Sequence, residues 1–184
     1  MGQFVLHVPD IEASGKQYRF AVPATWVASA LEGSELRADA SAEDGSLDVR
    51  ADRTGKEDIL VTGKLRSRVV TDCVRCLEDA GVDVDVDLAV LFSFRAAGAP
   101  PVDEPVEVEP GQPDRKHYSG EKIELDPIVR EHLILEVPMQ PLCAEDCSGI
   151  PIPDHVRPPA DFGKEADPRL APLEQLAAKL KSQK

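Results

Sequence analysis

The chain has 184 residues, a length that fits one domain with a substantial hydrophobic core. Hydrophobic residues make up 42% of the chain and charged residues 30%, a balance typical of globular proteins. The aromatic content is only 4%, so few side chains could stack on single-stranded nucleic acid. A net charge of −13 repels a phosphate backbone, which excludes DNA as an expected partner and favours a basic protein.

The N-terminal sequence MGQFVLHVPD has neither the cationic nor the apolar segment of a secretory signal. No apolar run approaches the roughly 18 residues that span a bilayer. We therefore expect a cytoplasmic protein with no membrane partner. In that compartment its four cysteines are thiols or metal ligands rather than disulfides.

The N-terminal third predicts short strands around one short helix. Residues 3–9 form an edge strand that stops at a proline, and residues 24–31 form one or two helical turns that end at Gly33. Two runs of alternating apolar and polar residues follow, at 35–44 and 46–53. Asp-Gly at their junction predicts that these two runs form a hairpin.

Two longer alternating runs, 58–70 and 82–94, predict a second hairpin. Alternation places apolar residues on one face of each strand and charged residues on the other. An antiparallel register centred between Arg75 and Cys76 gives five matched pairs: Arg68 with Asp83, Arg66 with Asp85, Lys64 with Asp87, Val69 with Val82, and Leu65 with Val86. A slip of one residue would expose the valines, whereas a slip of two keeps the faces and loosens the charge match. We therefore expect the matched register.

The second half of the chain predicts a loop, a helix and a tail. Residues 96–120 are rich in proline, glycine and acidic residues and predict a flexible acidic loop. A helix is predicted over 126–136 with Asp126 as its N-cap, and residues 148–184 predict a proline-rich tail with a C-terminal helix. We expect residues 1–147 to form a single α+β domain, with one core helix and an antiparallel sheet that could close into a barrel.

The cysteines form two pairs, Cys73-x2-Cys76 and Cys143-x3-Cys147. Each pair directs two thiolates at one centre, and together they complete a tetrahedral zinc site of structural type. Arg75, inside the first pair, could offset part of the thiolate charge. Three alternatives remain: buried or free thiols without metal, His155 as a substitute ligand, and a thiol–disulfide redox centre. The redox alternative is weaker because no βαβ pattern accompanies the first pair.

Four cations are candidate contacts for RNA phosphates or a partner: Lys64, Arg66, Arg68 and Arg75. The predicted hairpin neutralises three of them with aspartates, so we interpret the row as a solvated charge ladder and RNA contact as the alternative. The sequence contains no phosphate-binding glycine loop, no G-x-S-x-G and no H-E-x-x-H. We therefore assign no catalytic residue and expect no enzyme.

Three stretches together resemble a known family: CVRCLE at 73–78 with the acidic segment after it, ELDPIVREHLILEVPMQPLC at 124–143, and DPRLAPLEQL at 167–176. They are similar to the YceD family of large ribosomal RNA subunit accumulation proteins, best over residues 60–180. The resemblance implies a bacterial, non-enzymatic factor needed for 23S ribosomal RNA to accumulate. We expect it to assist large-subunit assembly by binding a basic ribosomal protein or a pre-ribosomal particle.

The resemblance is incomplete after the second cysteine pair. Relatives with a cysteine-rich tail continue with Cys-Pro-x-Cys-Gly, where this chain has Pro151 and Asp154 in place of the cysteines. At most one four-cysteine site is therefore expected. The alternative functions are a zinc-dependent RNA-binding module and a thiol–disulfide redox protein.

Overall fold

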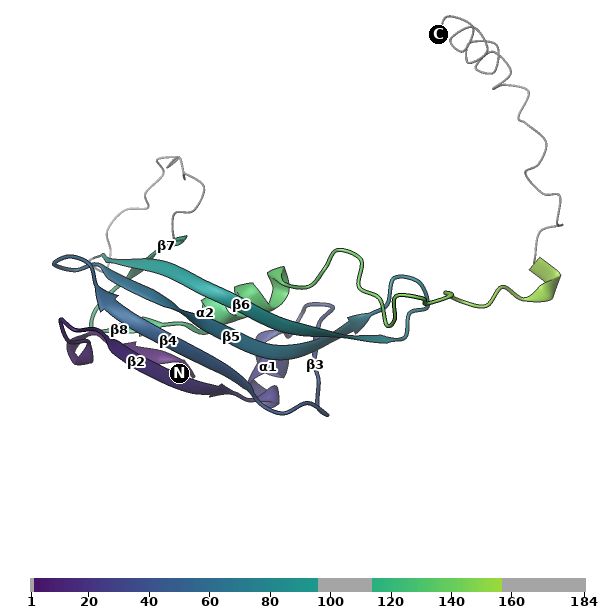
Figure 1. Ribbon diagram of the computed structural model, residues 1–184, viewed down its shortest axis with the longest axis horizontal. Coiled ribbons are helices and arrows are strands. Elements are labelled where there is room, and N and C mark those ends of the chain that lie inside the picture. The colour runs from purple at the N-terminus through teal and green to yellow at the C-terminus, as the bar shows by residue number, and fades with distance from the viewer. Residues whose placement is uncertain (1, 96–113, 157–184) are drawn as a thin grey trace, which may run out of the picture. The chain divides into compact units, whose positions relative to one another are not determined.

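A long hairpin of strands β5 (Ile59–Asp72) and β6 (Asp79–Phe94) forms the centre of the main sheet in the computed structural model (Figure 1). The structure describes residues 2–95 and 114–156. It divides the chain into two compact units, Met1–Gly149 and Ile150–Lys184. The sheet, both α-helices and all four cysteines belong to the first unit.

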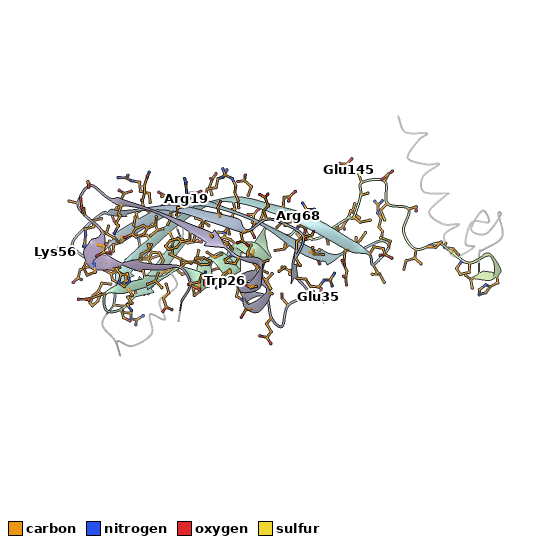
Figure 2. The ribbon with its side chains drawn as sticks, turned by 90° about the horizontal axis from the view of Figure 1, so that it is seen from below. Arg19, Trp26, Glu35, Lys56, Arg68 and Glu145 are labelled. Atoms are coloured by element: carbon orange, nitrogen blue, oxygen red, sulfur yellow. The ribbon has the colours of Figure 1, made fainter. Side chains whose placement is uncertain are left out.

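The register predicted for this hairpin is confirmed. The five observed pairs are Arg68 with Asp83, Arg66 with Asp85, Lys64 with Asp87, Val69 with Val82, and Leu65 with Val86. Leu65 and Val69 are fully buried on the inner face, while the charged residues occupy the outer face. Figure 2 shows Arg19 and Arg68 on the face of the sheet opposite Trp26. The hydrophobic pattern and the charge pattern therefore select the same register.

Four further strands complete the main sheet: β2 (Lys16–Val22), β3 (Arg37–Ala38), β4 (Gly45–Arg53) and β7 (Asp114–Tyr118). The strand order of the sheet is β2-β4-β5-β6-β7, and β3 pairs with the C-terminal part of β5, at Val69 and Val70. The pairs are antiparallel except β6–β7, which is parallel. The mostly antiparallel sheet and the helices packed on it confirm the α+β class. The described sheet is open and does not close into a barrel.

The hairpin predicted at the Asp44-Gly45 junction is wrong. Strand β3 pairs with β5, whereas β4 pairs with β2 and β5. A Cβ atom on Gly45 would lie 2.5 Å from the backbone oxygen of Arg66, closer than real Cβ contacts allow. The glycine therefore permits close approach of β4 to β5 rather than forming a two-residue turn.

The predicted loop at 96–120 is too long at its C-terminal end. Residues 114–118 form β7, and its Tyr118 is buried with its ring packed edge-on against Phe94 at a centroid distance of 5.6 Å. The Tyr118 hydroxyl donates a hydrogen bond of 2.8 Å to the Glu57 carbonyl oxygen. Residues 96–113 of that prediction lie outside the described residues, as does the C-terminal helix predicted in the tail.

Two helices and a small second sheet cover the inner face of the main sheet. They are α1 (Ala24–Ala30), α2 (Asp126–Leu135), and a pair of strands, β1 (Val5–His7) with β8 (Lys122–Glu124). Short 3₁₀ turns occupy Val8–Asp10 and, in the second unit, Asp154–Val156. The helices predicted at 24–31 and 126–136 are confirmed as α1 and α2. Leu47, Val129 and Leu133 lie in one hydrophobic core. No helix in the described part of the chain is long and apolar enough to cross a membrane.

Asp126 does not cap α2 as predicted; the N-cap is Leu125, and Asp126 is the first helical residue. Its carboxylate instead accepts hydrogen bonds from the backbone N–H groups of Gln3 at 2.7 Å and Phe4 at 2.9 Å. It also accepts one of 3.1 Å from the indole N–H of Trp26. A single half-buried carboxylate therefore ties the N-terminal segment and α1 to the start of α2.

Replacing Asp126 with alanine is expected to destabilise the fold by about 2 kcal/mol or more, because three donors lose a charged acceptor. Urea denaturation followed by the emission of Trp26, the chain's one tryptophan, measures the change. Asp10→Ala is the control, since Asp10 makes one exposed ion pair with Lys16 and should contribute less than about 1 kcal/mol. Equal destabilisation by the two substitutions would contradict the proposed role of Asp126.

Candidate metal centre

The connection between β5 and β6 is a tight turn that carries the first cysteine pair. The Cys73 N–H donates to the Glu78 carbonyl at 2.8 Å, and the Leu77 N–H donates to the Cys73 carbonyl at 2.9 Å. Leu77 has a φ of 65°, a left-handed conformation that is costly for a side chain larger than glycine. This turn leaves Cys73 buried at the end of β5 and Cys76 half-buried beside it.

The second cysteine pair lies in the segment that follows α2. The Val74 N–H donates to the Pro141 carbonyl at 3.0 Å, which holds this segment against the hairpin tip. A hydrogen bond of 3.1 Å from the Cys147 N–H to the Ala144 carbonyl closes the turn between the two cysteines. Gly149 follows with a φ of 79°, and a Cβ there would lie 3.3 Å from the Arg75 carbonyl oxygen. The two segments therefore make close backbone contact.

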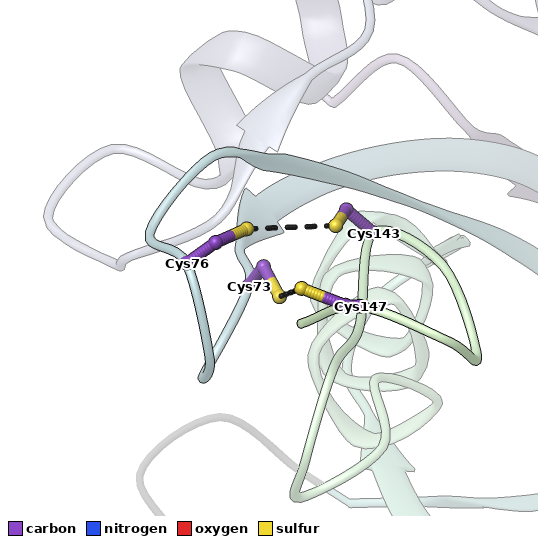
Figure 3. Close-up of side chains that lie close together, drawn as sticks. All are labelled: Cys73, Cys76, Cys143 and Cys147. Atoms are coloured by element: carbon purple, nitrogen blue, oxygen red, sulfur yellow. Dashed lines mark hydrogen bonds between the residues drawn. The ribbon is translucent and has the colours of Figure 1, made fainter. Parts of the chain in front are cut away.

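The structure brings all four predicted cysteines together (Figure 3). The Sγ atoms of Cys73 and Cys147 are 3.8 Å apart, those of Cys76 and Cys143 are 3.5 Å apart, and all four lie within 4.8 Å of one another. Sulfurs at the vertices of a tetrahedron with bonds of about 2.3 Å to a central zinc are separated by about 3.8 Å. A disulfide requires about 2.05 Å. The spacing therefore fits four ligands around one thiophilic metal ion.

The surroundings of the sulfurs favour the thiolate of Cys73 and oppose those of Cys76 and Cys143. Hydrogen bonds from the backbone N–H groups of Cys143, Arg75 and Cys76 lower the pKa of Cys73 to about 6. At Cys76 the N–H of Glu78 and the sulfur of Cys143 favour the thiolate, but burial and the sulfurs of Cys73 and Cys147 outweigh them and raise the pKa. The sulfurs of Cys76 and Cys147 raise the pKa of Cys143 to about 12. Ionisation of all four thiols at this spacing would need a bound cation to offset the charge, so the cluster is suited to a metal ion.

Arg75 connects the two cysteine segments. Its Nη1 donates to the carbonyl oxygen of Cys147 at 2.9 Å and, at the longer distance of 3.5 Å, to that of Glu145. Its backbone N–H points at the Cys73 sulfur at 3.5 Å. The guanidinium therefore holds the second segment, a contact that the spacing of the cysteines did not indicate, and the charge-offsetting role of Arg75 stays a prediction.

The other cations of the candidate contact row are paired with carboxylates on the outer face. Lys64 lies 2.7 Å from Asp85 and 3.8 Å from Asp87, Arg66 lies 3.5 Å from Asp85, and Arg68 contacts Asp83 and Asp39. These groups are exposed or partly exposed, so solvent screens each pair and the pairs contribute little to stability. The structure therefore forms the charge ladder that the alternating sequences predict.

Arg37, which the sequence analysis did not identify, bridges the two strands of the hairpin where the turn begins. Asp72 and Asp79 stand directly opposite each other in the register, where like charges repel. The Nη2 atom of Arg37, on β3, lies 2.9 Å from one carboxylate and 2.6 Å from the other. Facing aspartates in the predicted register were the available signal that a cation from elsewhere must lie between them.

Comparison with known proteins places the chain in a family. A family model described as large ribosomal RNA subunit accumulation protein YceD matches residues 61–177, which include the hairpin and both cysteine pairs. The chain belongs to the YceD family. The suspected resemblance is thereby confirmed, and the match covers more than half of the sequence.

Curated relatives of this YceD-family chain include uncharacterized mycobacterial proteins. Those of Mycobacterium bovis and Mycobacterium tuberculosis are 29% identical over 136 residues, covering 71% of this chain and 60% of the relative. One from Mycobacterium leprae is 30% identical over 105 residues, covering 57% of this chain and 45% of the relative. The chain thus spans well under two thirds of these relatives' length. No solved structure matches it significantly.

Arg75→Ala is expected to weaken metal binding at the four cysteines by about 10- to 100-fold, because groups that orient ligand-bearing segments contribute on that scale. Competition with a chromogenic chelator measures the affinity for added zinc. Arg130→Ala is the matched control, since Arg130 is also exposed and donates to a backbone carbonyl, that of Ala30, in a different part of the fold. Equal affinities in both variants would show that Arg75 does not support the centre.

Proposed function

We propose that this chain is a non-enzymatic factor that supports accumulation of 23S ribosomal RNA and assembly of the large ribosomal subunit in the cytoplasm. The observation that carries the proposal is the match to the YceD family over residues 61–177, whose description names large ribosomal RNA subunit accumulation. Its immediate partner is a basic ribosomal protein or a pre-ribosomal particle.

Charge supports a protein partner over naked RNA. The net charge of −13 opposes approach to a phosphate backbone. Lys64, Arg66 and Arg68, which would have to supply the phosphate contacts, already contact aspartates of β6. Ribosomal proteins that contact RNA carry positive charge, so an acidic surface attracts them and can shield them before assembly.

A structural zinc ion at the four cysteines is the second part of the proposal. Four thiolate ligands in tetrahedral spacing leave no open position for a reacting water, which is the coordination of structural rather than catalytic zinc. Bound there, zinc would join the tip of the β5–β6 hairpin to the segment after α2. Cys73, Cys76, Cys143 and Cys147 would be its ligands.

The position of the first pair argues against a thiol–disulfide enzyme. A redox Cys-x-x-Cys of the thioredoxin type sits where a strand meets a helix N-terminus. Here Cys73 and Cys76 sit in a hairpin turn between two antiparallel strands, and each lies within 3.8 Å of a cysteine sulfur of the other segment. A zinc-dependent RNA-binding module is the alternative function, and the experiments below distinguish it from an assembly factor that binds a protein.

Purified protein is expected to contain one zinc ion per chain by inductively coupled plasma mass spectrometry. All four thiols should become titratable after chelation, because all four are free cysteines. Cys76→Ser combined with Cys143→Ser should abolish binding while far-UV circular dichroism remains that of a folded sheet, since the core lies away from these two sulfurs. Metal-free protein with a reversible Cys73–Cys76 disulfide would instead indicate redox chemistry.

Depletion of the protein in a bacterium that encodes it is expected to lower the ratio of 23S to 16S ribosomal RNA. Affinity-tagged protein should enrich large-subunit ribosomal proteins or precursor particles, and contact with a ribosomal protein should survive nuclease treatment. Arg66→Glu is the discriminating variant, and it should leave this enrichment unchanged. Loss of RNA affinity in Arg66→Glu, with a weaker salt dependence, would favour the RNA-binding module. An unchanged RNA ratio after depletion would contradict the assembly role.

A further inference from the structure

The turn that carries the first cysteine pair displays two apolar side chains to solvent. Val74 is 51% exposed and Leu77 is 65% exposed, and both belong to the six-residue connection between β5 and β6. Neither side chain belongs to the hydrophobic core, although the backbone of this turn is held by hydrogen bonds on both sides of Val74 and Leu77. Exposed apolar groups on a rigid support are typical of protein-binding sites.

Leu77 is also held in a strained conformation. It is the one non-glycine residue with positive φ among the described residues, and glycine would adopt that φ at lower cost. The conformation projects a large apolar side chain into solvent beside the metal ligands. The strained backbone of Leu77 gains no burial of its side chain in the free protein. We therefore expect that this side chain contacts another molecule.

Three carboxylates belong to the two cysteine segments that meet at this tip. Glu78, Glu145 and Asp146 are exposed, and the described residues supply no ion pair to any of the three. The nearest cation on the same turn, Arg75, directs its Nη1 at two backbone carbonyls of the second cysteine segment. A zinc ion with four thiolates would add a net charge of about −2. This end of the hairpin is therefore strongly negative.

We infer that the tip of the hairpin docks a cationic protein segment that presents an apolar side chain. We call this site the knuckle surface and define it as Val74, Leu77, Glu78, Glu145 and Asp146. The apolar side chain of the partner packs on Val74 and Leu77, while its lysine or arginine side chains face the three carboxylates. The inference rests on the proposed function and adds to it where the partner binds and by what chemistry.

RNA does not fit this surface. Phosphates would face three unpaired carboxylates and the thiolate cluster, and no aromatic side chain on the knuckle surface offers a base a stacking partner. On the outer face, the cations of β5 already contact aspartates of β6, and Arg19 of β2 contacts Asp48. Charge and apolar exposure together therefore select a basic, partly apolar protein segment.

Two fluorescent 12-residue peptides test the recognition chemistry, one alternating lysine with leucine and one alternating lysine with serine. Fluorescence anisotropy with the full, zinc-loaded chain is expected to show about tenfold tighter binding of the leucine peptide. Val74→Ser combined with Leu77→Ser should remove this preference. Leu135→Ser is the matched control, since Leu135 is 68% exposed on α2, and it should retain the preference. A 12-nucleotide RNA should bind more weakly than either peptide.

A charge variant tests the carboxylates separately. Glu78→Gln, Glu145→Gln and Asp146→Asn together should weaken both peptides about tenfold and reduce the dependence of affinity on salt. The control carries the same change in net charge at three exposed acidic residues elsewhere, as Glu32→Gln, Glu35→Gln and Glu43→Gln. Zinc content and Trp26 emission should match the wild type in every variant, which shows that the fold and the centre are intact.

Co-sedimentation with large-subunit precursor particles distinguishes this inference from the proposed function. Particle binding by the wild type that is lost in the Val74/Leu77 variant and kept in Leu135→Ser supports both. Equal particle binding by wild type and variant overturns the knuckle surface and leaves the assembly role standing. An unchanged leucine preference in the variant, or tighter binding of RNA than of the peptides, also overturns the inference. Absence of any particle binding by the wild type contradicts the assembly role, and the peptides still decide the knuckle surface.

Discussion

The register of the β5–β6 hairpin is the constraint on which the rest of the structure depends. Burial of Leu65 and Val69 determines which face of β5 points inward. The charges of β5 and β6 then determine which residues of the two strands pair across the hairpin. The same register centres the turn between Arg75 and Cys76, so both cysteines of the first pair emerge at the tip. It also places Asp72 against Asp79, a repulsion that Arg37 offsets while attaching β3.

Sequence periodicity predicted this hairpin, both helices and the meeting of four cysteines, because each depends on a local pattern or on ligand spacing. It could not predict which other strands lie beside this hairpin. The runs around Asp44-Gly45 look like hairpin arms, yet β4 inserts between β2 and β5, where Gly45 allows close approach to the Arg66 backbone. The short β7 contains three charged residues in DRKHY and no clear alternation, so only its parallel pairing with β6 shows it to be a strand.

The candidate centre was predictable in its ligands but not in its support. Spacing identifies Cys73 and Cys76 as a half-site, but convergence with the second pair requires α2 to be fixed relative to the hairpin. That placement comes from buried Val129 and Leu133 and from the Asp126 carboxylate, which a capping pattern had assigned to another role. The guanidinium of Arg75 then bridges the two segments through backbone carbonyls, a contact with no sequence signature.

The distribution of charge links this architecture to the proposed partner. On the outer face, three cations of β5 contact aspartates of β6, so the ladder contributes register and little net field. At the tip, acidic residues outnumber cations, and the backbone N–H of Arg75 points at the sulfur of Cys73, whose pKa is lowered to about 6. Three exposed carboxylates, Glu78, Glu145 and Asp146, therefore lie in the two segments that meet at the tip, where Leu77 is exposed. On the proposed knuckle surface, a partner attracted by that charge would meet an apolar contact, whereas RNA would meet three carboxylates and no stacking group, and this difference would make the tip selective for a protein.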